Sequence, residues 1–284
     1  MAFSDLALKA ASESAVMAAH KNIAKLSLFA KSFSELNGRP GNSIAVPVYN
    51  LSAASAFDAV NNNYGTAANE IGGELITLDQ HLVKSVSITD VQEAETGIRW
   101  ASDTAAALAD TLTRGVNSYV FGLINSTNVS LSADTPTTKA TFAGLYAIAE
   151  DNDIPVDRCI VALKPTYFSA VLSCLDANTY GGSEAIRLGV VPGLYGFKGF
   201  VSTSNLPEGV NGAIICDSAI GIASRYVYPG TEGAYPEVWS ATDDDGFTIG
   251  FRRFMDLNAG VNKFAGDVLF GAKILQPTKV VRLV

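Results

Sequence analysis

The feature that most constrains this sequence is one long amphipathic run, from Gly97 to Asn125, which predicts a helix of 29 residues. Glu93 and Glu95 precede it, where negative charge interacts favourably with the helix dipole. At 1.5 Å per residue such a helix would be roughly 43 Å long, which is the length of a structural spine. Its apolar residues recur at three- and four-residue steps: Ile98, Ala101, Ala105, Leu108, Leu112, Val116, Tyr119 and Leu123.

Two runs that alternate between apolar and polar residues precede this helix and predict strands. The first is Ser43 to Tyr49, where Pro47 cannot donate to a ladder and therefore predicts pairing on one side only. The second, Glu74 to Asp90, has 17 residues and is long for one strand, so we expect a bend or bulge to divide it. One face of the second run is apolar: Ile76, Leu78, Leu82, Val86 and Ile88.

The segment between these strands, Leu51 to Gly73, is long and almost uncharged. Of its 23 residues, 15 are Ala, Asn, Gly or Ser, and only Asp58 and Glu70 carry charge. Loops longer than about 12 to 15 residues are uncommon in compact domains unless they serve a function or are disordered. We therefore predict a projecting hairpin that contacts a partner through residues at its tip: Phe57, Asn61, Asn62, Asn63 and Tyr64.

The N-terminal part of the chain, from Ser4 to Leu36, consists of good helix formers. Asn37, Gly38 and Pro40 follow and would end a helix there. We expect a helical arm that docks on another surface through residues at helical spacing: Ile23, Leu26, Phe29, Phe33 and Leu36.

The second half of the chain mixes helices with short strands. Lys139 to Asn152 predicts a helix, Cys159 to Leu163 a buried strand, and Pro165 to Leu175 another helix. Short apolar runs separated by Gly and Pro follow, without a regular βαβ alternation, so the predicted fold class is α+β. These runs are Phe197 to Thr203, Ala213 to Cys216, Glu237 to Ala241, Phe247 to Phe254 and Val268 to Leu275.

Charge is scarce in this chain. Charged residues make up 17%, against roughly 25% in typical soluble domains, which suits surfaces that are buried against neighbouring chains. The net charge of −8 argues against a protein whose main task is to grip nucleic acid, although the first forty residues carry five basic against three acidic side chains. With no apolar run of about 20 residues and no signal-like N-terminus, we expect synthesis in the cytosol.

Few residues offer catalytic chemistry of a familiar kind. His20 and His81 are the two histidines, and their positions favour a solvated or interface role over general-base catalysis. No GxSxG elbow and no GxxxxGK[ST] phosphate loop occurs, but a dispersed Ser-His-Asp set stays open because its members need not be adjacent.

Metal and thiol chemistry are not favoured either. Asp243, Asp244 and Asp245 before Gly246 could bind a hard cation such as Ca²⁺, yet a solvated Asp-Gly turn is the better interpretation. The cysteines lie in apolar contexts without CxxC spacing, which favours buried free thiols: Cys159, Cys174 and Cys216. We predict no catalytic residue, no cofactor and no metal site.

Three stretches carry a resemblance to a known family. The first is GNSIAVPVY (Gly41 to Tyr49) with its return at VSITD (Val86 to Asp90); the second is Ile154 to Leu172, continued by GLYGFKGFVSTSNLP (Gly193 to Pro207); the third is LFGAKILQPTKVVRLV (Leu269 to Val284). In this order they resemble the major capsid proteins of tailed double-stranded DNA phages, whose fold is shared with encapsulins and the herpesvirus capsid floor.

The resemblance implies five parts: an N-terminal helical arm (1–42), an extended hairpin loop (43–92), a peripheral domain with a spine helix (93–154), an axial domain (155–262) and a C-terminal return strand (263–284). It also implies hexamers and pentamers that form an icosahedral shell around packaged double-stranded DNA. The implied partners are further copies of the chain, a portal protein and, in members that need one, a scaffolding protein. The implied location is the virion capsid, assembled in the host cytoplasm.

The sequence departs from one pattern of this family. Some members cross-link a hairpin-loop Lys covalently to an Asn of a neighbouring subunit, but Leu51 to Val83 contains neither Lys nor Arg, so that reaction is not expected here. An encapsulin-like compartment shell is the nearest alternative, and a soluble hydrolase is a remote one.

Overall fold

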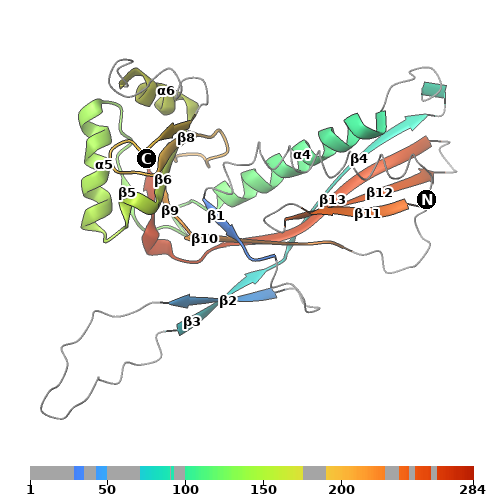
Figure 1. Ribbon diagram of the computed structural model, residues 1–284, viewed down its shortest axis with the longest axis horizontal. Coiled ribbons are helices and arrows are strands. Elements are labelled where there is room, and N and C mark those ends of the chain that lie inside the picture. Colours follow the sequence, from blue (N-terminus) through green and yellow to red (C-terminus); the bar gives the residue numbers. More distant parts are fainter. Residues whose placement is uncertain are drawn as a thin grey trace, which may run out of the picture.

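The computed structural model describes residues 29–34, 43–49, 71–89, 91–92, 100–174, 190–227, 237–242, 247–256 and 261–284. In these residues the chain forms two six-stranded sheets, a separate two-stranded hairpin and three helices of ten or more residues. Figure 1 shows an elongated molecule in which the hairpin projects from the body between two lobes. The predicted α+β class is confirmed.

Helix α4 (Trp100–Gly122) is the predicted spine. Its stripe is buried through Ala105, Leu108, Leu112 and Val116, and the helix packs along the long strand β13 (Val261–Ile274). The helix ends three residues before the predicted boundary. There the Asn125 side chain donates to the carbonyl of Gly122 and satisfies one of the last helical carbonyls.

The sheet beneath α4 is organised around β13. Strand β13 pairs with β12 (Thr248–Asp256) and β10 (Ile220–Arg225) along one edge and with β4 (Gln80–Thr89) along the other. The outer positions belong to β11 (Glu237–Thr242) beside β12 and β1 (Ala30–Ser32) beside β10. The buried aromatic rings of Trp239, Phe251 and Phe264 pack on one another in this sheet, with centroids 5.5 to 5.9 Å apart.

The second sheet forms the other lobe, around the C-terminus (Figure 1). Its order is β5-β14-β9-β6-β8-β7, and helices α5 (Lys139–Asp151) and α6 (Pro165–Cys174) pack against it. Phe142 of α5 meets Phe200 of β8 edge to face, with ring centroids 6.2 Å apart. The strands are β5 (Ser132–Ala133), β6 (Cys159–Leu163), β7 (Val190–Pro192), β8 (Gly199–Ser202), β9 (Gly212–Cys216) and β14 (Val280–Leu283).

The prediction of a helix through Leu36 is wrong at Ala30–Ser32, which form strand β1. This strand runs parallel to β10, and the Phe33 amide continues the ladder by donating to Ile222. Phe29, just before it, is buried and packs edge to face on Phe121. Tertiary pairing overrides helix propensity here; residues 1–28 and 35–42 lie outside the described part.

The two sheets do not follow the predicted domain ranges one to one. Range 155–262 contributes strands to both sheets, because β10, β11 and β12 pair in the sheet under α4 while β6 to β9 pair in the other. Helix α5, from range 93–154, packs on the second sheet. The predicted boundaries themselves stay a prediction.

Candidate assembly interface

The predicted hairpin is present as strands β2 (Ser43–Tyr49) and β3 (Ile71–Thr77). They pair in antiparallel register from Ser43 opposite Thr77 to Tyr49 opposite Ile71. Pro47 lies opposite Gly73, and β3 is the one described strand that pairs with β2. One-sided pairing, as Pro47 predicted, is confirmed for the described strands.

The root of the hairpin has its own small hydrophobic core. Ile44, Val46 and Val48 of β2 are buried together with Ile76 of β3 and with Leu78, which follows β3. They pack with Ala223 of β10 and Leu275 after β13. The hairpin is therefore anchored on the body at one end while it extends away from it (Figure 1).

The long alternating run is divided at Leu78 and Asp79, as predicted. Before the break β3 pairs with β2, and after it β4 pairs with β13. Strand β13 passes this point so closely that a Cβ at Gly271 would collide with the carbonyl of Thr77. This close approach of β13 to the end of β3 fixes the point at which the chain passes from the hairpin into the sheet of β13.

The predicted tip residues lie outside the described part of the chain: Phe57, Asn61, Asn62, Asn63 and Tyr64. Their role in contacts between subunits stays a prediction. The structure fixes the two strands that carry them, whose described ends are Tyr49 and Ile71.

Strand β4 offers a second surface for contact. It pairs with β13 along one side, and no described strand pairs with its other side. Val83 is 59% exposed and Val86 39% exposed, among exposed Lys84, Ser85 and Ser87. A ten-residue edge with exposed valines suits the addition of a strand from another chain.

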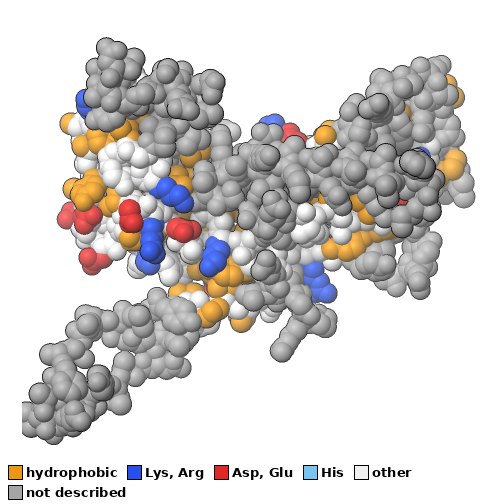
Figure 2. Space-filling view, viewed as in Figure 1, with side chains coloured by type: hydrophobic (Ala, Val, Ile, Leu, Met, Phe, Trp, Pro, Cys, Tyr) orange, Lys and Arg blue, Asp and Glu red, His pale blue; other side chains and the backbone are white. Residues whose placement is uncertain are grey.

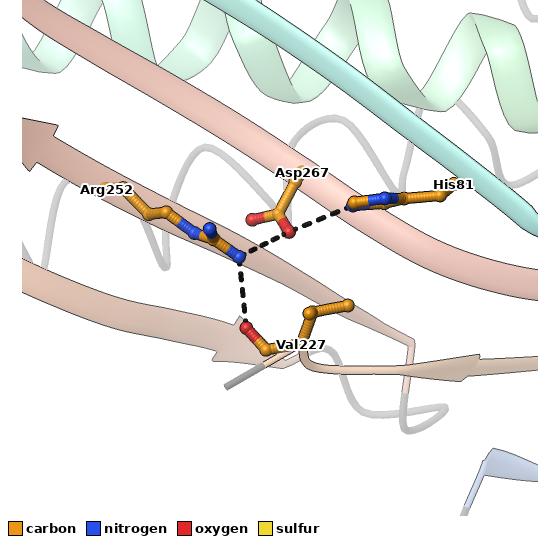
Figure 3. Close-up of polar contacts among 4 residues, drawn as sticks. All are labelled: His81, Val227, Arg252 and Asp267. Carbon is orange, nitrogen blue, oxygen red and sulfur yellow. Dashed lines mark hydrogen bonds and ion pairs between the residues drawn. The ribbon is translucent and has the colours of Figure 1, made fainter. Parts of the chain in front are cut away.

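A buried carboxylate holds the same sheet together from inside (Figure 3). Asp267 of β13 is 5% exposed, and its Oδ2 lies 2.9 Å from Nη2 of Arg252 and 3.3 Å from Nε2 of His81. The same Nη2 donates to the carbonyl of Val227 at 3.1 Å. No Cβ fits at Gly250, because it would lie 2.7 Å from Oδ1 of Asp267. The cluster joins β4, β12, β13 and the segment after β10.

His81 is thus a structural partner of Asp267, with its side chain 45% exposed on β4. The sequence favoured a solvated or interface histidine, and the contact with Asp267 adds a role inside the subunit. His20 lies outside the described residues.

We predict that Asp267→Asn lowers the free energy of unfolding by about 3 kcal/mol, because it leaves the largely buried Arg252 without its carboxylate. Asp110→Asn is the matched control, since the Asp110–Arg114 pair is exposed and should contribute less than about 1 kcal/mol. Urea unfolding of the unassembled subunit measures both. Equal effects of the two changes would contradict the structural role of the cluster.

Two of the cysteines face each other. Cys159 and Cys216 are register partners on β6 and β9, and both are buried and free. Hydrogen bonding from Cys159 lowers the pKa of Cys216 to about 7, and the same bond together with burial raises the pKa of Cys159. The prediction of buried free thiols is confirmed for this pair; Cys174 ends α6, and its side chain lies outside the described part.

No group of three or more His, Cys, Asp or Glu side chains within the described ranges could hold a metal ion. No helix in that part of the chain is long and apolar enough to cross a bilayer. Asp243, Asp244, Asp245 and Gly246 lie outside it.

Comparison with known proteins gives matches in structure alone. No family model matches the sequence, and no curated protein is significantly similar to it. The capsid of cyanophage P-SCSP1u superposes with a TM-score of 0.61 at 16% identity, over 90% of this chain and 86% of that one. The capsid of an empty GTA particle gives 0.59 at 15% identity, over 91% and 88%. A virus-like particle from Pyrococcus furiosus gives 0.54 at 11% identity, over 100% of both chains.

Each of these matches covers at least 90% of this chain. A structural match at such low sequence identity establishes the fold alone, and the function has to be argued separately. The chain has the capsid fold of tailed-phage shells, as its sequence predicted.

Proposed function

We propose that this chain is the major capsid protein of a tailed phage, which assembles into hexamers and pentamers and then into an icosahedral shell around double-stranded DNA. The observation that carries the proposal is the hairpin of β2 and β3, anchored in a buried core at its root and projecting from a body with the capsid fold. A projecting hairpin of this kind suits contact with another copy of the chain.

Two separate surfaces are available for contact between subunits, which favours assembly into a shell. The hairpin projects from the body and the exposed edge of β4 lies on it, so each can engage a different neighbour. A subunit that makes several modest contacts at once gains stability through multivalency. Pairing of the β4 edge would also cover a strand that otherwise favours aggregation.

The charge distribution suits a shell that encloses DNA without binding it tightly. The net charge is −8, and on the face shown in Figure 2 the coloured basic side chains lie among acidic ones and form no continuous basic patch. Tight phosphate binding needs clustered Lys and Arg. We propose non-specific contact with the packaged DNA, with a portal protein and, where the shell requires one, a scaffolding protein as further partners.

An encapsulin-like compartment would use the same fold. The solved phage capsids favour the phage shell, while the likeness to a virus-like particle from Pyrococcus furiosus keeps a compartment shell as the second candidate. Particles that enclose a co-expressed cargo enzyme, and that never package DNA when portal and terminase are supplied, would decide for the compartment.

We expect the purified chain, expressed alone or with a scaffolding protein, to form hollow particles of uniform diameter. Negative-stain electron microscopy and sedimentation velocity measure this directly. Assembled shells should bind free duplex DNA weakly. A chain that stays monomeric at high concentration under both conditions would overturn the proposal, and strong DNA binding with steep salt dependence would overturn its electrostatic part.

A further inference from the structure

A polar cleft of about 430 Å³ lies where helix α4 faces the end of β8 and the start of α6. Its volume is in the range of about 300 to 1,000 Å³ that is usual for ligand sites. One wall is Asp110, Thr113, Arg114 and Asn117 of α4; the other is the segment Ser202 to Asn205, with Phe121 and Pro165 at the ends. The second wall belongs to the STSNLP stretch, Ser202 to Pro207.

Two lining side chains on α4 each contain a buried oxygen that has no hydrogen-bond partner among the described residues. Thr113 is 2% exposed and Asn117 is 8% exposed, and neither Oγ1 of Thr113 nor Oδ1 of Asn117 has a partner there. An unsatisfied buried polar atom destabilises the subunit that contains it. Because the two residues are one helical turn apart, they face the same stretch of the cleft.

The chemistry of the lining selects an uncharged ligand. Asp110 and Arg114 neutralise each other through an ion pair of 2.9 Å, and the remaining polar groups are hydroxyls and amides. Such groups match the N–H and C=O groups of an extended peptide, which needs both donors and acceptors. A phosphate or a duplex would need clustered cations, and the lining contains one arginine that is already paired.

We infer that the cleft receives an uncharged, extended peptide segment from a second copy of this chain. The chain contains a segment of suitable composition: 15 of the 23 residues from 51 to 73 are Ala, Asn, Gly or Ser, and only two are charged. A peptide seated there, with a small rotation of the Thr113 and Asn117 side chains, satisfies both buried oxygens. The inference rests on the proposed shell function, which places copies of the chain side by side.

The test compares the effect of one double variant on the stability of the free subunit with its effect on the stability of the shell. Thr113→Val with Asn117→Leu removes both unpartnered groups at nearly constant volume, so the Tm of the unassembled subunit should stay unchanged or rise. In the shell the same change leaves the bound peptide unpaired, so the concentration of free subunits at equilibrium should rise roughly tenfold. Thr111→Val is the matched control, because its exposed hydroxyl on the same helix donates to the carbonyl of Ala107.

A photo-crosslinking amino acid in place of Ser204, an exposed residue of the cleft, identifies the occupant. In assembled shells we expect a product of twice the subunit mass on a denaturing gel, in good yield in the Thr111→Val background and much reduced in the double variant. Well-formed shells without this product, a link within one chain, or an adduct with another protein would overturn the inference while leaving the proposed function intact. Absence of particles from the unmodified chain would instead overturn the proposed function.

Discussion

Replacing residues 50–70 with a two-residue Asn-Gly turn is expected to give a subunit that folds normally but forms no stable shells. Tyr49 and Ile71 are register partners, so a type I′ turn of two residues closes the hairpin without strain. The buried root, which contains Ile44 and Ile76, is untouched. What is lost is the segment that we propose to contact a neighbouring copy, and each subunit in a shell loses it at once.

Circular dichroism and thermal unfolding of the unassembled subunit measure folding, and electron microscopy with sedimentation velocity measures assembly. The control keeps the full loop and changes its proposed contact residues to alanine: Phe57, Asn61, Asn62, Asn63 and Tyr64. A graded loss of shells, from the native chain through the alanine variant to the shortened one, is expected. Normal shells from the shortened hairpin would remove the role proposed for it.

Local patterns in the sequence predicted the elements that bury one regular face. The apolar stripe of α4 and the alternation of β2 with β3 led to the correct elements, because periodicity reports directly which side chains are buried. The break at Leu78 and Asp79 was expected from length alone. Strand β10 (Ile220–Arg225) was missed, because its small residues Gly221, Ala223 and Ser224 give little apolar alternation.

Pairing between distant segments was not predictable. Residues 30–32 have helix-like spacing, and the partner that makes them a strand lies near residue 221. The assignment of strands to two sheets depends on the same kind of long-range contact. Propensity describes a segment by itself, so it cannot show which distant segment competes for it.

The polar features of the candidate surfaces were also missed, although the sequence contains a signal for each. Asp267 is a single carboxylate inside the largely apolar strand β13, and a buried charge requires a partner. Thr113 and Asn117 are polar residues beside the apolar stripe of α4. In both places a polar residue within or next to an apolar pattern is buried and needs a polar partner.

Leu108→Asp in helix α4 is expected to prevent folding of the subunit altogether. Leu108 is 1% exposed and lies against β13, where Gly266 lets the helix approach closely. The change removes a buried leucine, which costs about 2 to 5 kcal/mol, and adds a carboxylate for which the apolar surroundings offer no partner. The sum approaches or exceeds the roughly 5 to 15 kcal/mol by which domains are stable.

Ser118→Asp is the matched control for this prediction, because it adds the same charge on the exposed face of the same helix, four residues after Arg114. Soluble yield and the circular dichroism of the unassembled subunit distinguish the two variants. If Leu108→Asp folds as well as Ser118→Asp, the apolar stripe of α4 does not face the core. The shared capsid fold would then position α4 differently in this chain, and the proposals for the hairpin and the cleft, which depend on the same packing of α4 on β4 and β13, would fall together.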